Sequence, residues 1–253
     1  MEDRHFPTQP LAEPEPGDRI GDVRVLAHVA RGGMATVLAV EDLRPGADPD
    51  RKLALKLLLP LDGSEEAQSR FRREFRSLSR LHHPNVLRVH EWGMYGDRPW
   101  FTMELLDGHD LRVEAEQLQE MPAAERFPRI EAILVQVARA LAYVHERGLV
   151  HRDVTPGNLM VTAGRKAPAS DPSSLPDGSV KLMDFGVVKE AGGDMTAVGE
   201  LIGTVAYMSP EQITGDEIDA RSDLYSLGAV LYLLLTGRRP FQAHTIHGFM
   251  EKH

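Results

Sequence analysis

Residues 151–160 read "HRDVTPGNLM" and place a histidine, two charged residues and an amide within ten positions. The preceding residues, 127–148, have apolar side chains at helical spacing, and "VKLMDFG" at 180–186 has the composition of a short strand. A loop that gathers polar side chains between regular elements is a frequent location of catalytic residues. The stretch therefore predicts a catalytic loop, and it carries the neutral residue Thr155 just before its proline.

Two apolar runs flank this loop and predict buried helices. In the first run, Gly148 ends the helix, and one face is formed by Ile130, Ile133, Leu134, Val137, Leu141 and Val144. The second run, "LYSLGAVLYLLLTG" at 224–237, has an apolar stretch of about a dozen residues, shorter than the roughly 20 that a helix needs to cross a bilayer. The C-terminal part of the chain is therefore expected to be mainly helical, with no membrane segment.

Strand patterns dominate the chain before residue 102. Short runs rich in Val and Leu alternate with Gly or Pro turns: "DVRVLAHVA", "TVLAVEDL", "LALKLLL", "NVLRVHEWG" and "PWFTMELL". One helix interrupts them at 64–81, where the expected N-cap is Ser64 and the residues at helical spacing are Phe71, Phe75, Leu78 and Leu81. The sequence thus predicts an α+β fold whose first lobe is a small twisted antiparallel sheet with one helix.

The composition limits the class of protein. The 253 residues are 42% hydrophobic and 26% charged, which is typical of a folded chain with enough apolar material for two lobes. Because the chain has no cysteine, disulfides and thiolate metal sites are excluded, and a cytoplasmic location is the default expectation. The net charge of −9 argues against a nucleic-acid partner. Residues 1–21 lack the layout of a signal peptide and are expected to be a disordered leader, and 163–179 a mobile surface insertion.

Further motifs occur along the chain in a fixed order, although each is weak by itself. They are the glycine turn "RGGMATV" at 31–37, Lys56, Glu74, the loop at 151–158, "DFG" at 184–186 and "SPE" at 209–211. In this order, and with "GTVAYMSPEQ", "DARSDLYSLG" and "LLTGRRPF", the chain resembles the bacterial branch of the eukaryotic-like (Hanks-type) Ser/Thr protein kinases.

The resemblance implies a bilobal kinase domain over 22–253. Its N-lobe would span about 22–106 and its C-lobe about 107–253. The resemblance also implies that the family's last helices are missing, so that the C-lobe is truncated and Glu211 lacks its arginine partner.

The resemblance assigns the nucleotide to the first lobe. Lys56 would contact the α- and β-phosphates and pair with Glu74, while the backbone of Glu104 and Leu106 would bind adenine. The lid over the phosphates would be formed by Val29, Ala30, Arg31, Gly32, Gly33, Met34, Ala35, Thr36 and Val37. Alanine stands at positions 30 and 35, where the family has glycine, and because alanine resists positive φ we expect a looser lid.

The resemblance places the chemistry in the second lobe. Asp153 would orient the acceptor hydroxyl or accept its proton. Asp184 and Asn158 would bind Mg²⁺, or Mn²⁺, because carboxylate and amide oxygens suit hard ions. His151 is interpreted as a structural anchor of the loop. Thr155 stands where the family has a lysine, so one positive charge is lost and slower transfer is predicted.

Two threonines are assigned to the segment between the "DFG" and "SPE" motifs. Arg152 would hold this activation segment when it is phosphorylated, and Thr196 is the candidate phosphosite. Thr204, within "GTVAY", would line the substrate groove.

The resemblance implies an ATP-dependent Ser/Thr protein kinase that phosphorylates other proteins and its own activation segment. Such a kinase can also form dimers. Ala30, Ala35 and Thr155 favour an alternative, a catalytically weak pseudokinase that acts as an ATP-binding or scaffold module. A small-molecule kinase of the aminoglycoside or choline type shares the loop pattern but lacks a peptide groove such as "GTVAYMSPEQ".

Overall fold

The computed structural model describes residues 12–33, 35–48, 51–60, 65–163, 175, 178–185, 204–243, 248, 249 and 252. The expected features that lie outside these residues include Ser64, Met34, Gly186, Thr196, residues 1–11 of the leader and most of 163–179. The described residues form two compact units. The first contains the residues up to Ser79 and Arg88–Leu105, and the second contains Arg80–Leu87 and the residues from Leu106 onward.

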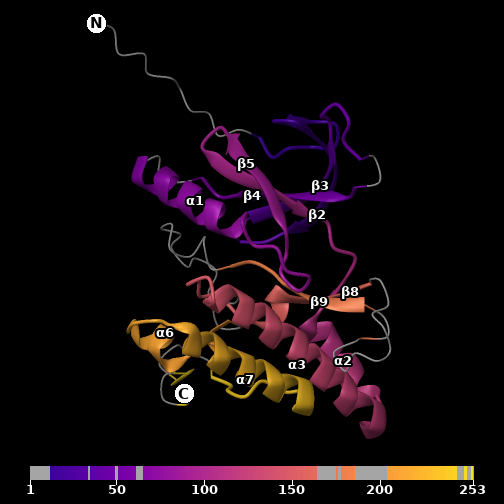
Figure 1. Ribbon diagram of the computed structural model, residues 1–253, viewed down its shortest axis with the longest axis vertical. Coiled ribbons are helices and arrows are strands. Elements are labelled where there is room, and N and C mark those ends of the chain that lie inside the picture. The colour runs from indigo at the N-terminus through magenta and orange to yellow at the C-terminus, as the bar shows by residue number, and fades with distance from the viewer. Residues whose placement is uncertain are drawn as a thin grey trace, which may run out of the picture. The chain divides into compact units, whose positions relative to one another are not determined.

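The first unit is built on one antiparallel sheet with the strand order β1-β2-β3-β4-β6-β5. Its strands are β1 (Arg19–Ile20), β2 (Val23–Arg31), β3 (Ala35–Asp42), β4 (Leu53–Leu58), β5 (Val89–Tyr95) and β6 (Arg98–Glu104). The five strands expected from the Val- and Leu-rich runs are confirmed, and Figure 1 shows α1 beside the sheet.

The two faces of this sheet pack against different partners. One face forms a hydrophobic core of Ile20, Val23, Val25, Leu38, Val40, Leu53, Leu55, Leu57 and Trp100. Side chains alternate between the faces, so the cross-strand neighbours Val37, Lys56 and Phe101 share the opposite face. Helix α1 (Glu65–Leu78) packs on that face, because its Phe75 ring lies 6.3 Å from the Phe101 ring. The fold therefore brings α1, with Glu74, to the side of the sheet that carries Lys56.

Helix α1 is shorter than its sequence pattern indicates. Phe71 and Phe75 are buried as expected, and Phe71 makes an edge contact with Trp92. The helix ends at Leu78, which is only partly buried, and Leu81 lies beyond the helix, buried in the second unit.

The N-terminal boundary of the fold differs from the prediction. Residues 12–21, expected to belong to a disordered leader, include strand β1 and the buried side chain of Ile20. Glu13 accepts hydrogen bonds from Arg98 Nη1 (2.8 Å) and from the Thr36 hydroxyl (3.3 Å). Burial acts to raise the pKa of Glu13, but the bonds from Arg98 lower it on balance. A Pro- and Glu-rich composition suggested disorder here, because composition cannot show that Glu13 has a buried guanidinium as its partner.

The second unit is mainly helical, as predicted. Its helices are α2 (Leu111–Glu120), α3 (Ala123–His145), α6 (Pro210–Thr214) and α7 (Ala220–Thr236). A small antiparallel sheet contains β7 (Gly108–Asp110), β8 (Leu159–Ala163) and β9 (Gly178–Leu182) in that order. Helix α7 packs against both α2 and α3 (Figure 1). Among the described residues, we find no helix whose length and apolar character would let it cross a membrane.

The two helices predicted around the loop are present. The apolar face of α3 is buried except at Leu134, which is partly exposed, and the helix begins at Ala123, before the apolar pattern starts. Gly148 follows the end of α3 with a φ of 71°, and Gly237 ends α7 with a φ of 69°. Both glycines therefore occupy the left-handed conformation that glycine adopts at least cost.

A buried polar cluster fixes the strand that leads to Asp184. Asn85 donates through Nδ2 to Gln136 Oε1 (2.7 Å) and to the Val180 carbonyl (2.9 Å), and Gln136 Oε1 also accepts the Val180 N–H (2.8 Å). The carbonyl of Leu182 accepts the Leu87 N–H at 2.9 Å. These bonds hold β9 against α3 and against the segment that precedes β5.

Candidate active site

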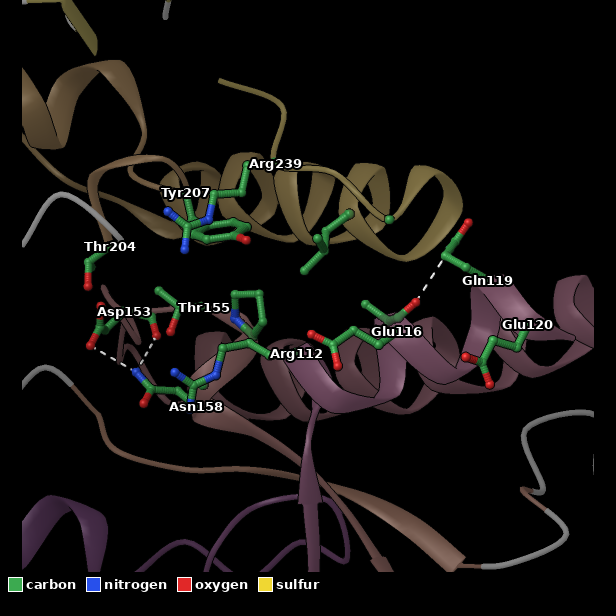
Figure 2. Close-up of a pocket in the computed structure, with 15 residues that line it drawn as sticks. Arg112, Glu116, Gln119, Glu120, Asp153, Thr155, Asn158, Thr204, Tyr207 and Arg239 are labelled. Atoms are coloured by element: carbon green, nitrogen blue, oxygen red, sulfur yellow. Dashed lines mark hydrogen bonds between the residues drawn. The ribbon is translucent and has the colours of Figure 1, made fainter. Parts of the chain in front are cut away.

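The predicted catalytic loop, 151–158, ends in the 3₁₀ turn η1 (Pro156–Asn158), directly before β8. Asn158 donates through Nδ2 to the Asp153 carbonyl (2.9 Å) and to Asp153 Oδ2 (2.8 Å), as Figure 2 shows. Because the amide nitrogen of Asn158 is directed at Asp153, its amide oxygen is directed away and can accept other contacts. The predicted catalytic aspartate and the predicted metal-binding asparagine thus form one hydrogen-bonded pair.

His151 connects the loop to the residues that precede Asp184. Its ring is buried, with Nε2 2.8 Å from the Met183 carbonyl and Nδ1 accepting the Asp153 N–H at 3.2 Å. These contacts require a neutral ring whose proton is on Nε2. Burial is the main cause that lowers the pKa of His151, although Asp223 and other nearby carboxylates act to raise it. Both ring nitrogens hold backbone groups, which supports the interpretation of His151 as an anchor.

A buried carboxylate on α7 holds the backbone of the same loop. Asp223 accepts the N–H of His151 and the N–H of Arg152, each at 2.8 Å, through its two different oxygens. His145 Nε2 lies 2.7 Å from Asp223 Oδ2, and the Asp223 side chain is only 1% exposed. The start of the catalytic loop is therefore fastened to the core helix through one side chain.

Backbone strain is concentrated in this region. Among the described residues, Arg152 (φ 66°) and Asp184 (φ 51°) are the two non-glycine residues with positive φ. Such a conformation persists only where surrounding contacts enforce it. For Arg152 they do so from both sides, because its N–H is bound by Asp223 and its carbonyl accepts Gln212 Nε2 at 2.8 Å.

The "SPEQ" segment forms the start of α6. Gln212 Oε1 accepts the Ser209 N–H at 3.0 Å in a capping box, while Gln212 Nε2 reaches Arg152. Glu211 accepts a hydrogen bond from the Ser222 hydroxyl, which lowers the pKa of Glu211. Glu211 was expected to lack its arginine partner; the bond from Ser222, on the neighbouring helix, means that the carboxylate is nevertheless not unpaired.

A second buried carboxylate secures α2. Glu114 is 0% exposed and accepts hydrogen bonds from Arg129 and from His109 Nε2 (2.8 Å). Burial acts to raise the pKa of Glu114, but the bonds from Arg129 and His109 lower it on balance. The pair fixes the helix that forms one wall of the groove beside the catalytic loop.

This groove has a volume of about 1000 Å³ and lies within the second unit (Figure 2). It is lined by Arg112, Ala115, Glu116, Gln119, Glu120, Asp153, Thr155, Pro156, Gly157, Asn158, Thr204, Tyr207, Leu233, Gly237 and Arg239. Thr204 and Asp153 line the same groove, and the assignment of Thr204 to a substrate groove stays a prediction. Thr155 lines it as well, so the position that carries lysine in the family presents a neutral side chain here.

The predicted phosphate lid is part of the antiparallel pair β2–β3 in the first unit, which has a register shift between His28 and Ala30. Ala30 pairs with Val37 and Arg31 with Thr36, and the Gly32 N–H donates to the Ala35 carbonyl at 2.9 Å. Neither Ala30 nor Ala35 has a positive φ. We expected a looser lid because alanine resists positive φ. Since neither alanine has a positive φ, this reason no longer applies.

The structure divides the other predicted site residues between the two units. Lys56 and Glu74 are half-buried in the first unit, whereas Leu106 and Asp184 belong to the second. Thr36 is 3% exposed and bonded to Glu13, so its side chain lies on the sheet face opposite Lys56. If Thr36 contacts a phosphate as part of the lid, it can therefore do so only through its backbone.

The metal-binding assignment fits the residues present. Met183 N–H donates to the Asn158 carbonyl at 2.8 Å, which holds Asp184 close to Asn158 in the second unit. Within the described part of the chain, no three His, Asp or Glu side chains gather into a metal cage of their own. Mg²⁺ is usually held by one or two protein ligands together with substrate phosphates, and Asp184 and Asn158 provide such a pair.

Sequence reasoning missed the residues that support the loop. Asp223 and Gln212 lie inside motifs that the sequence singles out, but their roles depend on contacts to residues 60 or more positions away. One signal was available for Asp223, because it is an acidic residue just before the apolar run that predicts a buried helix.

Comparison with known proteins agrees with this geometry. A family model for the protein kinase domain matches residues 24–253. The chain is 39% identical to the serine/threonine-protein kinase PknL of Mycobacterium tuberculosis, with 86% of this chain and 50% of PknL covered. It is 38% identical to the serine/threonine-protein kinase pkn3 of Myxococcus xanthus, with 91% of this chain and 40% of pkn3 covered. The chain thus spans about half the length of these relatives or less.

A solved structure gives the same result for the fold. The kinase domain of PknI from Mycobacterium tuberculosis matches with a TM-score of 0.68 and 29% sequence identity, covering 92% of this chain and 80% of that one. The expected bilobal kinase fold is confirmed by this similarity. The chain belongs to the protein kinase family, in its bacterial, Hanks-type serine/threonine branch.

Proposed function

We propose that this domain transfers the γ-phosphate of Mg-ATP to serine or threonine hydroxyls of proteins. The observation that carries the proposal is the Asp153–Asn158 pair at one end of a groove that also contains Thr204. Asp153 lines this groove, and its carboxylate would orient a hydroxyl and accept its proton.

In this proposal the second unit supplies the acceptor site and the metal ligands. Asp153 positions the hydroxyl, while the amide oxygen of Asn158 and the carboxylate of Asp184 hold Mg²⁺. When bound, the ion neutralises phosphate charge, which is a major part of catalysis in phosphoryl transfer. The neutral Thr155 leaves less positive charge around the transferred group than the family's lysine would, so we expect a slow enzyme.

The first unit would bind the nucleotide. Lys56 would contact the α- and β-phosphates with Glu74 as its partner, and the hairpin 29–37 would cover the phosphates with its backbone. The N–H of Glu104 donates to the Arg88 carbonyl at 3.1 Å, so Glu104 would offer adenine its carbonyl instead. Lys56 and Asp153 are both present, which supports activity over the pseudokinase alternative.

Three properties follow from the family resemblance alone. We propose that the chain phosphorylates itself at Thr196 and that the side chain of Arg152 then binds the phosphate. Dimerisation and a cytoplasmic location stay predictions of the same kind. Mass spectrometry of protein incubated with Mg-ATP tests the first, because phosphate confined to other segments would contradict it.

The test of the proposal is phosphate transfer from labelled ATP to a generic protein substrate. Lys56→Met should reduce transfer by about 10²–10³-fold, the usual loss when one group that stabilises transition-state charge is removed. Lys52→Met is the matched control, because Lys52 is an exposed lysine four residues earlier and should tolerate the change. If the unchanged chain binds Mg-ATP but transfers no phosphate to the protein substrate, the domain is a pseudokinase and the proposal is wrong.

A further inference from the structure

The distribution of charge in the groove is uneven. Two arginines, Arg112 and Arg239, lie toward the end that contains Asp153, while Glu116 and Glu120 line it farther from Asp153 along α2 (Figure 2). An acceptor segment bound in this groove would meet guanidinium groups near its hydroxyl and carboxylates farther away. The two arginines must be considered separately, because their surroundings differ.

Arg112 is already neutralised by a neighbour. Its guanidinium donates through Nε to Asp110 Oδ2 at 3.0 Å and forms a salt bridge with the same carboxylate. Asp110 also caps α2 by accepting the N–H groups of Arg112 (2.8 Å) and Val113 (3.3 Å). Because this carboxylate is committed to both tasks, the charge of Arg112 is largely balanced within the protein.

Arg239 has a different environment. It is exposed, and among the described residues no carboxylate lies within salt-bridge distance of it. Burial raises the pKa of the Tyr207 hydroxyl, and the guanidinium of Arg239 acts to lower it. Figure 2 shows Arg239 beside Tyr207, on the groove wall opposite Arg112. An exposed guanidinium in the groove, beside a buried tyrosine and without a carboxylate partner among the described residues, is suited to bind an anionic group.

We infer that Arg239 is a specificity-determining residue that selects acceptor segments carrying an aspartate or glutamate close to the phosphorylated Ser or Thr. This inference rests on the proposed kinase function and names the substrate class of the same groove. The neutral Thr155 strengthens it, because a lysine there would place another cation beside Asp153 and share the attraction for an acidic side chain. With Thr155 in that position, Arg239 is a cation of the groove that no carboxylate of the described residues balances.

The experiment uses a set of threonine peptides that differ only in the position of one aspartate, from four residues before the threonine to four after it. An otherwise identical peptide with asparagine at each position is the reference. For the chain as it exists, kcat/KM should be about 5–10-fold higher for aspartate than for asparagine at one or two positions, as expected for one exposed charge-assisted bond. In Arg239→Gln this ratio should fall to about 1.

Arg238→Gln is the matched control, because Arg238 is the adjacent exposed arginine and does not line the groove. This variant should keep the full aspartate preference. Binding of fluorescent aspartate and asparagine peptides by anisotropy gives a second readout that does not need transfer, and thermal melting checks that each variant is folded.

The possible outcomes separate this inference from the proposed function. Transfer to peptides with no aspartate preference, or a preference that survives in Arg239→Gln, overturns the role of Arg239 and leaves the kinase function standing. A preference lost equally in Arg238→Gln also overturns it, because the effect would then be general electrostatics. Absence of transfer to every peptide overturns both.

Discussion

The hairpin 29–37 and the loop 151–158 both belong to the motifs on which the family resemblance rests, yet the structure forms them in different ways. The hairpin is antiparallel sheet with a register shift between His28 and Ala30, and the alanines at its two expected glycine positions have no positive φ. The loop contains Arg152 in a left-handed conformation and is held by a buried acid from a distant helix. The hairpin is thus defined by local pairing, whereas the loop is defined by tertiary contacts.

The difference shows which motif tolerates change. A hairpin held by its own strand pairing needs no special residue to keep its backbone, so alanine can replace glycine without strain. A loop held in a costly conformation depends on each of the groups that enforce it, because the strain is offset only by those bonds. Substitutions around the loop should therefore cost much more than substitutions in the hairpin.

The largest effect is expected at Asp223. Asp223→Ala leaves the N–H groups of His151 and Arg152 buried without their acceptor, which should lower the free energy of unfolding by about 3–5 kcal/mol. Transfer should fall with it, because Asp153 directly follows the released backbone. Urea unfolding monitored by circular dichroism measures the loss. Glu217→Gln, an exposed acid shortly before the same helix, is the control and should be near neutral; equal costs for the two variants would contradict the role of Asp223.

The next effect is a pH dependence caused by His151. Its pKa is lowered in the folded protein, so the unfolded chain binds a proton more readily, and the contribution of the neutral ring is present above about pH 6.5 and lost as the pH falls below it. Between pH 7 and pH 5.5 the free energy of unfolding should fall by about 1 kcal/mol because of this residue. The measurement is urea unfolding of the wild type and His151→Gln at both values.

The comparison with His151→Gln is needed because burial also lowers the pKa of His83 and, to about 4, that of His90. Those two residues contribute to the slope in both proteins. If the wild type and the variant lose the same stability on acidification, His151 is not buried in its neutral form.

A smaller effect is expected from the strained backbone at Arg152. Arg152→Gly and Arg152→Ala both remove the guanidinium, but only glycine adopts a φ near 66° without cost. Arg152→Gly should therefore be about 1 kcal/mol more stable than Arg152→Ala in urea unfolding. Equal stability of the two variants would show that the left-handed conformation is absent in solution.

The smallest effect is expected in the hairpin. Restoring the family's glycines with Ala30→Gly and Ala35→Gly should cost about 0.5 kcal/mol each, because glycine weakens a strand. ATP affinity, measured by calorimetry, should stay within about twofold of the wild type, since the backbone is already in its relaxed form. A clearly higher ATP affinity in either variant would show that the alanine at that position weakens ATP binding in the unchanged chain.

The sequence was sufficient to predict the strands and helices whose side chains follow a local periodic pattern. The strands around Lys56 and the helices on either side of the loop follow from side-chain periodicity, and the order of the motifs identified the family before any contact was known. The N-terminal boundary was wrong, because the Pro- and Glu-rich composition of 12–20 conceals the bonds from Arg98 and Thr36 to Glu13. No periodicity encodes a bond across such a distance.

Within the site, sequence reasoning named the groups that would touch the substrates and missed those that hold them. Asp153 and Asn158 are recognisable by their spacing, and the structure brings them together. Asp223 and Gln212 could not be assigned, because their partner is the backbone of Arg152, which any residue presents equally. The expectation of a looser lid rested on a positive φ at Ala30, and sequence alone could not show that this φ is absent.

The most direct test of the account is the behaviour of Asp153→Asn. The amide oxygen of the new side chain can still accept the hydrogen bond from Asn158, so fold and Mg-ATP affinity should be unchanged, while the loss of a proton acceptor should reduce transfer by about 10²–10⁴-fold. Asp97→Asn, in the exposed turn between β5 and β6, is the control and should transfer normally. Calorimetric ATP binding and transfer of labelled phosphate, measured on the same preparations, give the result: retained binding with lost transfer is predicted, and near-normal transfer by Asp153→Asn would contradict the assignment of the loop as the catalytic site.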